Sequence, residues 1–237
     1  MDTPTFARPG IWTTTIACTL MLLTGCQCPS AGSPSTDTGS QSADSVANAP
    51  VQPDQNVRIL FDGNSLGQWT PTEFGGGAEV EVEDGCIILP QGNDMTGVTW
   101  TGDVVRMNYE LSLEAKRVMG NDFFCGLTFP VGNDPCSLIV GGWGGAVVGL
   151  SSLDNLDAAN NDTTRFRRFE DNRWYRIRVR VTPNRIQAWI DDEQMVDVDT
   201  TDRKVGIRNE MERSVPLGIA TWRTTGAIRN IRLTILE

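Results

Sequence analysis

The sequence of 237 residues contains no histidine. Histidine serves as the base in Ser-His-Asp and Cys-His nucleophile sets, is a frequent zinc ligand, and has the side chain whose ordinary pKa lies nearest neutral pH. Those sets and any histidine-bearing zinc site are therefore excluded. Catalysis by this chain would have to use carboxylates, arginine, tyrosine or a bound ion.

Basic residues are also few relative to acidic ones. The chain has 20 Lys and Arg against 30 Asp and Glu, a formal net charge of −10. Most affinity for nucleic acids comes from the neutralisation of phosphates by Lys and Arg. We therefore expect no nucleic-acid partner.

The first 25 residues have the features of an export signal. Residues 11–23 are uncharged and mostly apolar, and the preceding ten residues contain one basic group, Arg8. A bilayer core about 30 Å thick needs roughly 20 apolar residues, so this run is too short for a permanent membrane span. The sequence predicts a signal peptide over residues 1–25.

The signal ends in Leu23-Thr24-Gly25-Cys26, which resembles a bacterial lipobox. The resemblance implies cleavage before Cys26, lipidation of the Cys26 thiol, and an exported protein anchored to a membrane of the cell envelope. The alternatives are an ordinary secretory signal, in which Cys26 has no special role, and a cytoplasmic protein.

Residues 26–56 are predicted to form a disordered linker. Residues 27–56 contain six Ser, four Pro, three acidic residues and no aromatic residue. Such a segment buries too little apolar surface to offset the entropy of ordering it. We expect it to hold the folded domain away from the membrane.

Residues 57–237 are predicted to form one all-β domain. Short runs of alternating apolar and polar residues recur about every ten residues, separated by Gly, Asn, Asp and Pro, which is typical of a sandwich or barrel. No stretch shows a convincing helical period. The clearest strands are 79–83, 109–114, 123–129, 146–150, 174–182, 185–190, 194–198 and 227–236, of which 174–198 form a three-stranded meander.

Charge is distributed unevenly along this domain. Residues 57–160 hold 4 basic and 14 acidic side chains, whereas residues 161–237 hold 15 basic and 12 acidic ones. We expect a ladder of arginines to face a ladder of glutamates across neighbouring strands. The expected ladders are Arg176, Arg178 and Arg180 against Glu79, Glu81 and Glu83, and the alternative is an arginine-lined ligand cleft.

Two cysteines, Cys125 and Cys136, flank a Gly-Asn-Asp-Pro turn at residues 132–135. Export would permit a disulfide between them across a hairpin. The alternative is a pair of buried free thiols that pack as small apolar groups.

Several motifs resemble the 3-keto-disaccharide hydrolase family. Leu60-Phe61-Asp62-Gly63, with Leu66 and Trp69, follows the pattern L-F-D-G-x-x-L-x-x-W that opens the family's domain. Further matches are residues 109–116, Gly120-Asn121, residues 174–179, residues 185–190 and residues 229–233. The resemblance implies a concanavalin A-like jelly-roll β-sandwich that processes oxidised glycosides.

The chain departs from the family at two positions. The family's G-[YF]-E-x-Q pattern corresponds here to residues 145–150, Gly-Ala-Val-Val-Gly-Leu, and its D-H-G is replaced around Trp222-Arg223. Both changes remove groups that could bind a metal ion or move a proton. Whether the domain binds a metal ion therefore stays open.

Glu114 and Asp122 are the candidate catalytic carboxylates. Glycoside cleavage commonly uses two carboxylates about 5–10 Å apart across a cleft. Asp122 is expected at the mouth of the strand that follows the one bearing Glu114. The alternative is that Glu114 is a solvated strand residue and Asp122 a turn residue.

Trp143, Trp222 and Arg223 are the candidate ligand-binding residues. Sugar rings stack on aromatic faces while their hydroxyls bind planar polar groups. Trp143 is flanked by four glycines, which would let a ligand approach the backbone closely. The alternative for each aromatic residue is ordinary packing.

Loop oxygens provide a candidate Ca²⁺ site. Gly-Asn-Asp occurs at residues 92–94, 120–122 and 132–134, and residues 155–162 contain three Asn and two Asp. Calcium binds such oxygens, but the same residues are typical of plain turns.

Three functions therefore remain open. The first is an enzyme that acts on a glycoside, and the second is a module that binds carbohydrate without catalysis. The third is a structural lipoprotein of the envelope that contacts other proteins.

Overall fold

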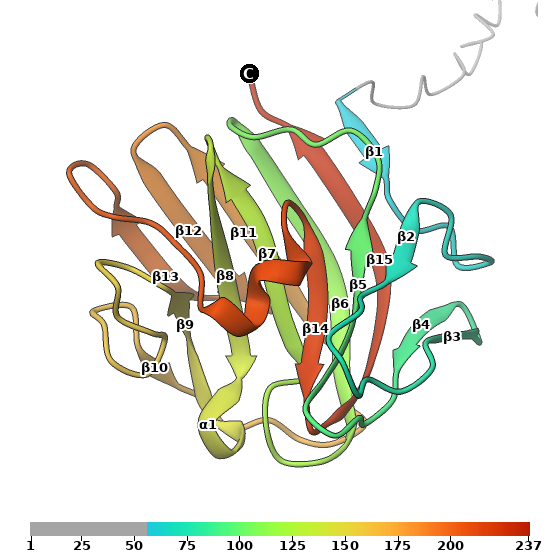
Figure 1. The fold of residues 1–237 in the computed structure, drawn as a ribbon. Coiled ribbons are helices and arrows are strands. Elements are labelled where there is room, and N and C mark those ends of the chain that lie inside the picture. The colour runs from blue at the N-terminus through green and yellow to red at the C-terminus, as the bar shows by residue number, and fades with distance from the viewer. Residues whose placement is uncertain (1–55) are drawn as a thin grey trace, which may run out of the picture. The chain divides into compact units, whose positions relative to one another are not determined.

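The computed structural model describes residues 56–237, which form a sandwich of two antiparallel sheets (Figure 1). The front sheet has seven strands. In spatial order they are β10 (Arg165–Phe166), β9 (Val147–Ser151), β8 (Asp134–Gly141), β7 (Cys125–Val131), β14 (Gly218–Trp222), β5 (Met95–Trp100) and β2 (Trp69–Pro71).

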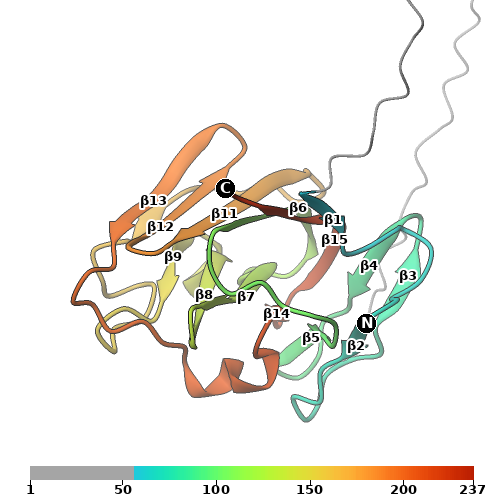
Figure 2. The same cartoon turned by 90° about the horizontal axis from the view of Figure 1, so that it is seen from above.

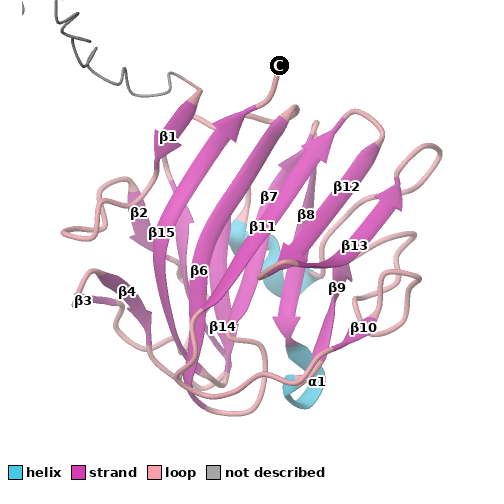
Figure 3. Cartoon of the chain, turned by 180° about the vertical axis from the view of Figure 1, so that it is seen from behind, coloured by secondary structure: helices cyan, strands magenta, loops and turns pink. Residues whose placement is uncertain are grey.

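The back sheet lies behind the front sheet and is nearest the viewer in Figure 3. In spatial order its strands are β13 (Glu193–Asp199), β12 (Arg185–Ile190), β11 (Tyr175–Thr182), β6 (Tyr109–Met119), β15 (Thr225–Ile235), β4 (Cys86–Leu89) and β3 (Glu81–Glu83), and β1 (Val57–Ile59) also pairs with β15. Helical structure in the described part of the chain is limited to α1 (Gly142–Gly145) and the 3₁₀ turn η1 (Asn209–Ser214).

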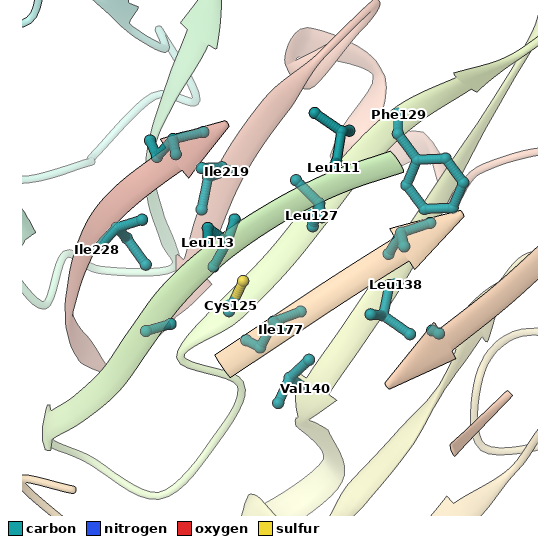
Figure 4. Packing of buried hydrophobic residues seen from close by; sticks show 14 of the residues in the cluster. Leu111, Leu113, Cys125, Leu127, Phe129, Leu138, Val140, Ile177, Ile219 and Ile228 are labelled. Atoms are coloured by element: carbon teal, nitrogen blue, oxygen red, sulfur yellow. The ribbon is translucent and has the colours of Figure 1, made fainter. Parts of the chain in front are cut away.

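The view from above shows the two sheets as two layers (Figure 2), and the buried apolar side chains of the core come from both of them. Alternate residues of β6 and β11 point inward because side chains alternate between the two faces of a strand. Figure 4 shows the residues of both sheets that meet in this core, among them Leu111, Leu113 and Ile177 of the back sheet and Cys125, Leu127 and Leu138 of the front sheet.

The predicted all-β sandwich is confirmed, and each predicted strand overlaps an observed one. The predicted meander is also confirmed, since β11 pairs with β12 and β12 with β13. Seven strands were not predicted: β1, β2, β4, β5, β8, β10 and β14. Of these, β4, β5, β8 and β14 are fully or largely buried and therefore lack a simple apolar–polar alternation. The other three are only two or three residues long.

The predicted partners of the arginine ladder are wrong. Strand β11 pairs with β6, and two further strands, β15 and β4, separate β6 from β3, which carries Glu81 and Glu83. Arg178 and Arg180 instead form ion pairs with Glu110 of β6, at 3.4 and 2.9 Å. Arg176 pairs with Asp192, at 3.0 Å.

Cys125 and Cys136 are free, buried thiols. They lie on the hairpin β7–β8, but Cys125 is opposite Val140 and Cys136 is opposite Phe129. This offset of four residues corresponds to roughly 13 Å along a strand, whereas a disulfide needs Cα atoms within about 7 Å. The disulfide alternative is therefore wrong, and the free-thiol alternative is confirmed.

The expectations for the signal peptide, for lipidation of Cys26 and for the linker concern residues that precede the described ones, apart from Asn56 at the linker's end. Among residues 56–237, no helix has the length and apolar character needed to cross a membrane.

Candidate functional site

The outer face of the front sheet is hollowed above a row of small residues. Across β5, β14, β7, β8 and β9, register places these residues side by side: Gly97, Ala220, Gly126, Ile139 and Gly149. Four of these five positions carry a hydrogen atom or a methyl group as a side chain. The sheet therefore leaves space that larger residues from the surrounding loops partly fill.

The turn η1 forms one wall of this hollow. It lies on the side of the front sheet that faces away from the back sheet (Figure 2). A Cβ atom added to Gly126 would lie 3.0 Å from the ring of Phe123 and 3.4 Å from the terminal methyl of Met211 in η1. Met211 of η1 and Met95 of β5 are buried together, with Phe123 and Trp222 packed against them.

The resulting space, here called the first hollow, has a volume of about 270 Å³. It is lined by Met95, Asp122, Phe123, Ile139, Trp143, Arg208, Glu210, Met211 and Trp222. Three of the residues proposed from the sequence are therefore brought together: Asp122, Trp143 and Trp222. They come from three separate loops or strand ends.

Trp143 stands on a turn of left-handed backbone at the lower end of β8 and β9 (Figure 1). Its own φ is 48°, and Gly141, Gly144 and Gly145 have φ of 78°, 84° and 104°. Positive φ costs little at glycine and more at any other residue, so the flanking glycines permit this turn. The turn leaves Trp143 44% exposed at the edge of the hollow.

Asp122 ties this turn to the loop between β6 and β7. Its Oδ1 accepts a hydrogen bond from the backbone N–H of Phe123 at 2.8 Å, and its Oδ2 accepts one from Gly144 at 3.2 Å. Its own backbone N–H donates to Oγ1 of Thr224 at 3.1 Å. The carboxylate is thus fixed in place at the rim of the hollow.

The opposite rim carries a charged pair that the sequence did not single out. Arg208 bonds the carboxylate of Glu210 at 2.8 Å and that of Asp157 at 3.0 Å. The hydrogen bond from Arg208 lowers the pKa of the Glu210 carboxyl, which therefore stays ionised at neutral pH. No local pattern marks the η1 segment, because its six residues form neither a strand nor a full helical face.

Glu114 does not line this hollow. It lies on β6 of the back sheet, on the face that points away from the core, and its Oε2 accepts a hydrogen bond from Nε of Arg229 at 2.7 Å. The structure therefore does not bring Glu114 and Asp122 together. The second carboxylate that lines the first hollow is Glu210.

Arg223 adjoins the hollow without lining it. Its guanidinium lies 5.5 Å from the ring centre of Trp222 and pairs with Asp94 at 2.7 Å. Arg223 thus supports the position of Trp222 from outside.

Apolar packing fills the place where the family pattern has its carboxylate and amide. In the pattern G-[YF]-E-x-Q these groups stand two and four residues after the glycine, which here are Val147 and Gly149. Val147 packs with Ile139 and Ala158, and Gly149 lies so close to Ala158 that an added Cβ would be 2.9 Å from its carbonyl oxygen. Neither position therefore presents a polar side chain to the hollow.

Two arginines bind the carboxylates of residues 154–162, a segment that includes the candidate calcium stretch 155–162. Arg203 pairs with Asp154 at 2.7 Å and with Asp162 at 2.9 Å, and Asp157 pairs with Arg208. These guanidinium groups take the carboxylate oxygens that a calcium ion would need. Within residues 56–237, no three His, Cys, Asp or Glu side chains are placed to hold a metal ion together.

Solved structures share the sandwich fold at low sequence identity. The Crh5 transglycosylase, in complex with NAG, superposes with a TM-score of 0.53 at 12% identity, covering 77% of this chain and 85% of its own. A protein described with the endo-acting O-glycanases of the human gut microbiota superposes with a TM-score of 0.50 at 13% identity, covering 76% and 100%. The carbohydrate-binding module CBM66 from Bacillus subtilis gives 0.48 at 14% identity, covering 70% and 95%. At such low identity, the first two superpositions show the fold alone.

No curated protein sequence matches this chain. Residues 56–234, in contrast, match the family described as the 3-keto-alpha-glucoside-1,2-lyase-like domain, the family that the sequence motifs indicated. This match covers nearly all of the described residues, so the chain belongs to the 3-keto-alpha-glucoside-1,2-lyase-like domain family.

Proposed function

We propose that the domain binds a glycoside in the first hollow. The observation that carries this proposal is the meeting of Trp143, Trp222 and Asp122 around one space of about 270 Å³. Aromatic faces bind the C–H faces of sugar rings, and fixed carboxylates accept hydrogen bonds from the hydroxyls. The Arg208–Glu210 pair adds donors and acceptors on the other rim.

Family membership supports the choice of ligand class. The family's description names a 3-keto-glucoside, and the Crh5 transglycosylase, which shares the fold, holds NAG. The ligands expected here are glycosides, including those oxidised to a ketone at carbon 3.

Binding is tested with the mature protein on an array of glycosides and 3-keto-glycosides, followed by calorimetric titration of the ligands found. Trp143→Ala and Trp222→Ala are each expected to weaken binding about tenfold, which corresponds to about 1.4 kcal/mol. Trp189→Ala is the matched control, because Trp189 lies on the back sheet beneath Arg178. Unchanged binding in both hollow variants would contradict the proposal.

A second candidate function is elimination at the same site, because two carboxylates, Asp122 and Glu210, line the hollow. In a 3-keto-glucoside the hydrogen on carbon 2 is acidified by the neighbouring ketone. A carboxylate removes this proton, the electron pair forms the carbon 1–carbon 2 double bond, and the bond from carbon 1 to the glycosidic oxygen breaks. The leaving oxygen takes up a proton from the carboxylic acid formed in the first step, which restores the carboxylate. This assignment requires only the groups that face the hollow.

Elimination is tested by incubating the protein with 3-keto-glucosides and following the unsaturated product by its ultraviolet absorbance. Asp122→Asn and Glu210→Gln are each expected to reduce turnover at least a hundredfold if their carboxylates transfer protons. Binding without any turnover would support the binding function and contradict the enzymatic one.

We also propose that the chain is exported and lipidated at Cys26. The support is the sequence of residues 1–26, with its short apolar run and lipobox-like end. Labelling of bacterial cells with a fatty-acid analogue should mark the wild-type protein but not Cys26→Ser. Equal labelling of both would contradict this assignment.

A further inference from the structure

A second hollow lies beside the first. It has a volume of about 590 Å³, and among its lining residues are Arg117, Asn121, Gly144, Phe166 and Arg168. The strand β10, which carries Phe166, is at the edge of the front sheet, next to the lower end of β9 (Figure 1).

The two hollows share one narrow ridge. Asp122 and Trp143 line the first hollow, whereas their chain neighbours Asn121 and Gly144 line the second. Neighbouring Cα atoms are about 3.8 Å apart, so the ridge is about one residue wide. The hydrogen bond from Gly144 to Asp122 joins its two sides.

The second hollow contains an unusual exposed aromatic ring. Phe166 is 77% exposed, although fully apolar rings are generally buried. In the register of β9 and β10, Phe166 lies opposite Val147, which packs in one cluster with Ile139 and Phe123 of the first hollow. The exposed ring therefore lies on the same outer face of the front sheet as the first hollow and offers a second stacking surface there.

The second hollow also contains one uncompensated charge. Arg117 pairs with Asp171, Arg167 with Asp191 and Glu193, and Glu170 with Arg173. Of the charged residues that line this space, Arg168 alone has no ion-pair partner within residues 56–237. A free guanidinium beside an aromatic ring is a suitable receptor for an anionic group.

We propose that the second hollow is a subsite for an acidic sugar unit of the same glycan that occupies the first hollow. The ring of that unit stacks on Phe166, and its anionic group binds the guanidinium of Arg168. The ligand class is thus an oligosaccharide with a uronic acid or another anionic unit next to the unit held by Trp143 and Trp222. This inference rests on the proposed carbohydrate-binding function.

The experiment uses the mature protein on an array of neutral, uronate-containing, sialylated and sulfated oligosaccharides. Glycans with a carboxylate are expected to bind about tenfold more tightly than their carboxyl-reduced counterparts, in which the uronate is converted to a neutral sugar. The preference should decrease as salt is added, because the charges are close to solvent. Comparison of sulfated with uronate-containing oligosaccharides distinguishes a sulfate from a carboxylate as the anionic group that Arg168 binds.

Arg168→Gln should remove the preference for acidic glycans and leave the binding of neutral ones unchanged. Phe166→Ala should weaken binding of the acidic oligosaccharides about tenfold while leaving single neutral sugars unaffected. Arg58→Gln is the charge-matched control, since Arg58 is exposed on β1 at the other end of the molecule (Figure 1).

The outcomes separate this inference from the function on which it rests. Equal affinity for acidic and carboxyl-reduced glycans would overturn the subsite while leaving the first hollow as the binding site. An equal loss of preference in Arg58→Gln would also overturn it, because the effect would then be one of overall charge. Failure to bind any glycan would overturn both proposals.

Discussion

The carboxylate of Asp122 accepts a hydrogen bond from the backbone N–H of Gly144 at 3.2 Å. This contact joins the loops before β7 and after β8, from residues 22 positions apart, and it holds the turn on which Trp143 stands. The position of Trp143 therefore depends on Asp122, for which the sequence left open a catalytic role and a role as a turn residue.

Asp122→Ala should release this turn. Loss of its two hydrogen bonds to backbone N–H groups is expected to lower the free energy of unfolding by about 1–2 kcal/mol. The indole signal of Trp143 should also move in NMR spectra. Asp134→Ala, at the exposed first residue of β8, is the control, and an unmoved Trp143 signal in Asp122→Ala would contradict this role.

Two glycines of the same turn should differ in their tolerance of alanine. Both have positive φ, but an added Cβ at Gly145 would lie 2.9 Å from Arg117 and 3.1 Å from the carbonyl of Asn121, whereas at Gly144 nothing lies within 4 Å. Gly144→Ala is expected to cost about 1–2 kcal/mol from backbone strain alone. Gly145→Ala should lower the free energy of unfolding, measured with urea, by clearly more. An equal decrease in the two variants would contradict this prediction.

The thiols of Cys125 and Cys136 should be inert in the folded protein. Burial raises the pKa of each to about 12, so almost no thiolate forms at neutral pH. Mass spectrometry should find both residues unmodified by iodoacetamide until the protein is unfolded. A reductant should leave the melting temperature unchanged, and a drop of several degrees would reveal a disulfide that this structure does not contain.

The pair of Arg203 with Asp162 should stabilise the fold in a pH-dependent way. The hydrogen bond from Arg203 lowers the pKa of the Asp162 carboxyl below its usual value of 3.8. The stabilisation is therefore present above about pH 4 and is lost as the pH falls through the lowered pKa.

Arg203→Ala should accordingly lower the free energy of unfolding by about 1 kcal/mol at pH 7, which is typical for a partly exposed ion pair. The decrease should be smaller near pH 2, where Asp162 is protonated. Lys204→Ala removes the same charge next to it and serves as the control. A difference between wild type and Arg203→Ala that stays constant from pH 7 to pH 2 would contradict this assignment.

Strands with one solvated face could be predicted from the sequence. Residues 174–182 alternate between inward apolar side chains and outward arginines, and this alternation recurs in the buried and exposed positions of β11. In contrast, β8 carries six consecutive buried residues, so its sequence has no period of two to detect. The register of β11 against β6 was also beyond the sequence, because it depends on strands far apart in the chain.

Part of the candidate site was predictable: Trp143, Trp222 and Asp122 were candidates from the sequence, whereas Arg208 and Glu210 were not. Trp143 was conspicuous because of its four flanking glycines, and Trp222 because it stands where the family has other residues. Arg208 and Glu210 carry no such mark. They reach the hollow because η1 folds over β5 and β14, which is a tertiary contact that no local pattern encodes.

The central claim is that the first hollow binds a sugar, and tryptophan signals test it most directly. The described domain has six tryptophans in three settings: Trp143 and Trp222 line the hollow, Trp69 and Trp100 are buried in the core, and Trp174 and Trp189 lie under cations of the back sheet. Each has an indole N–H signal in a ¹⁵N-labelled sample titrated with a glycan that the array identifies. The account predicts shifts of the Trp143 and Trp222 signals with the other four unmoved, and shifts confined to Trp174 and Trp189 would contradict it.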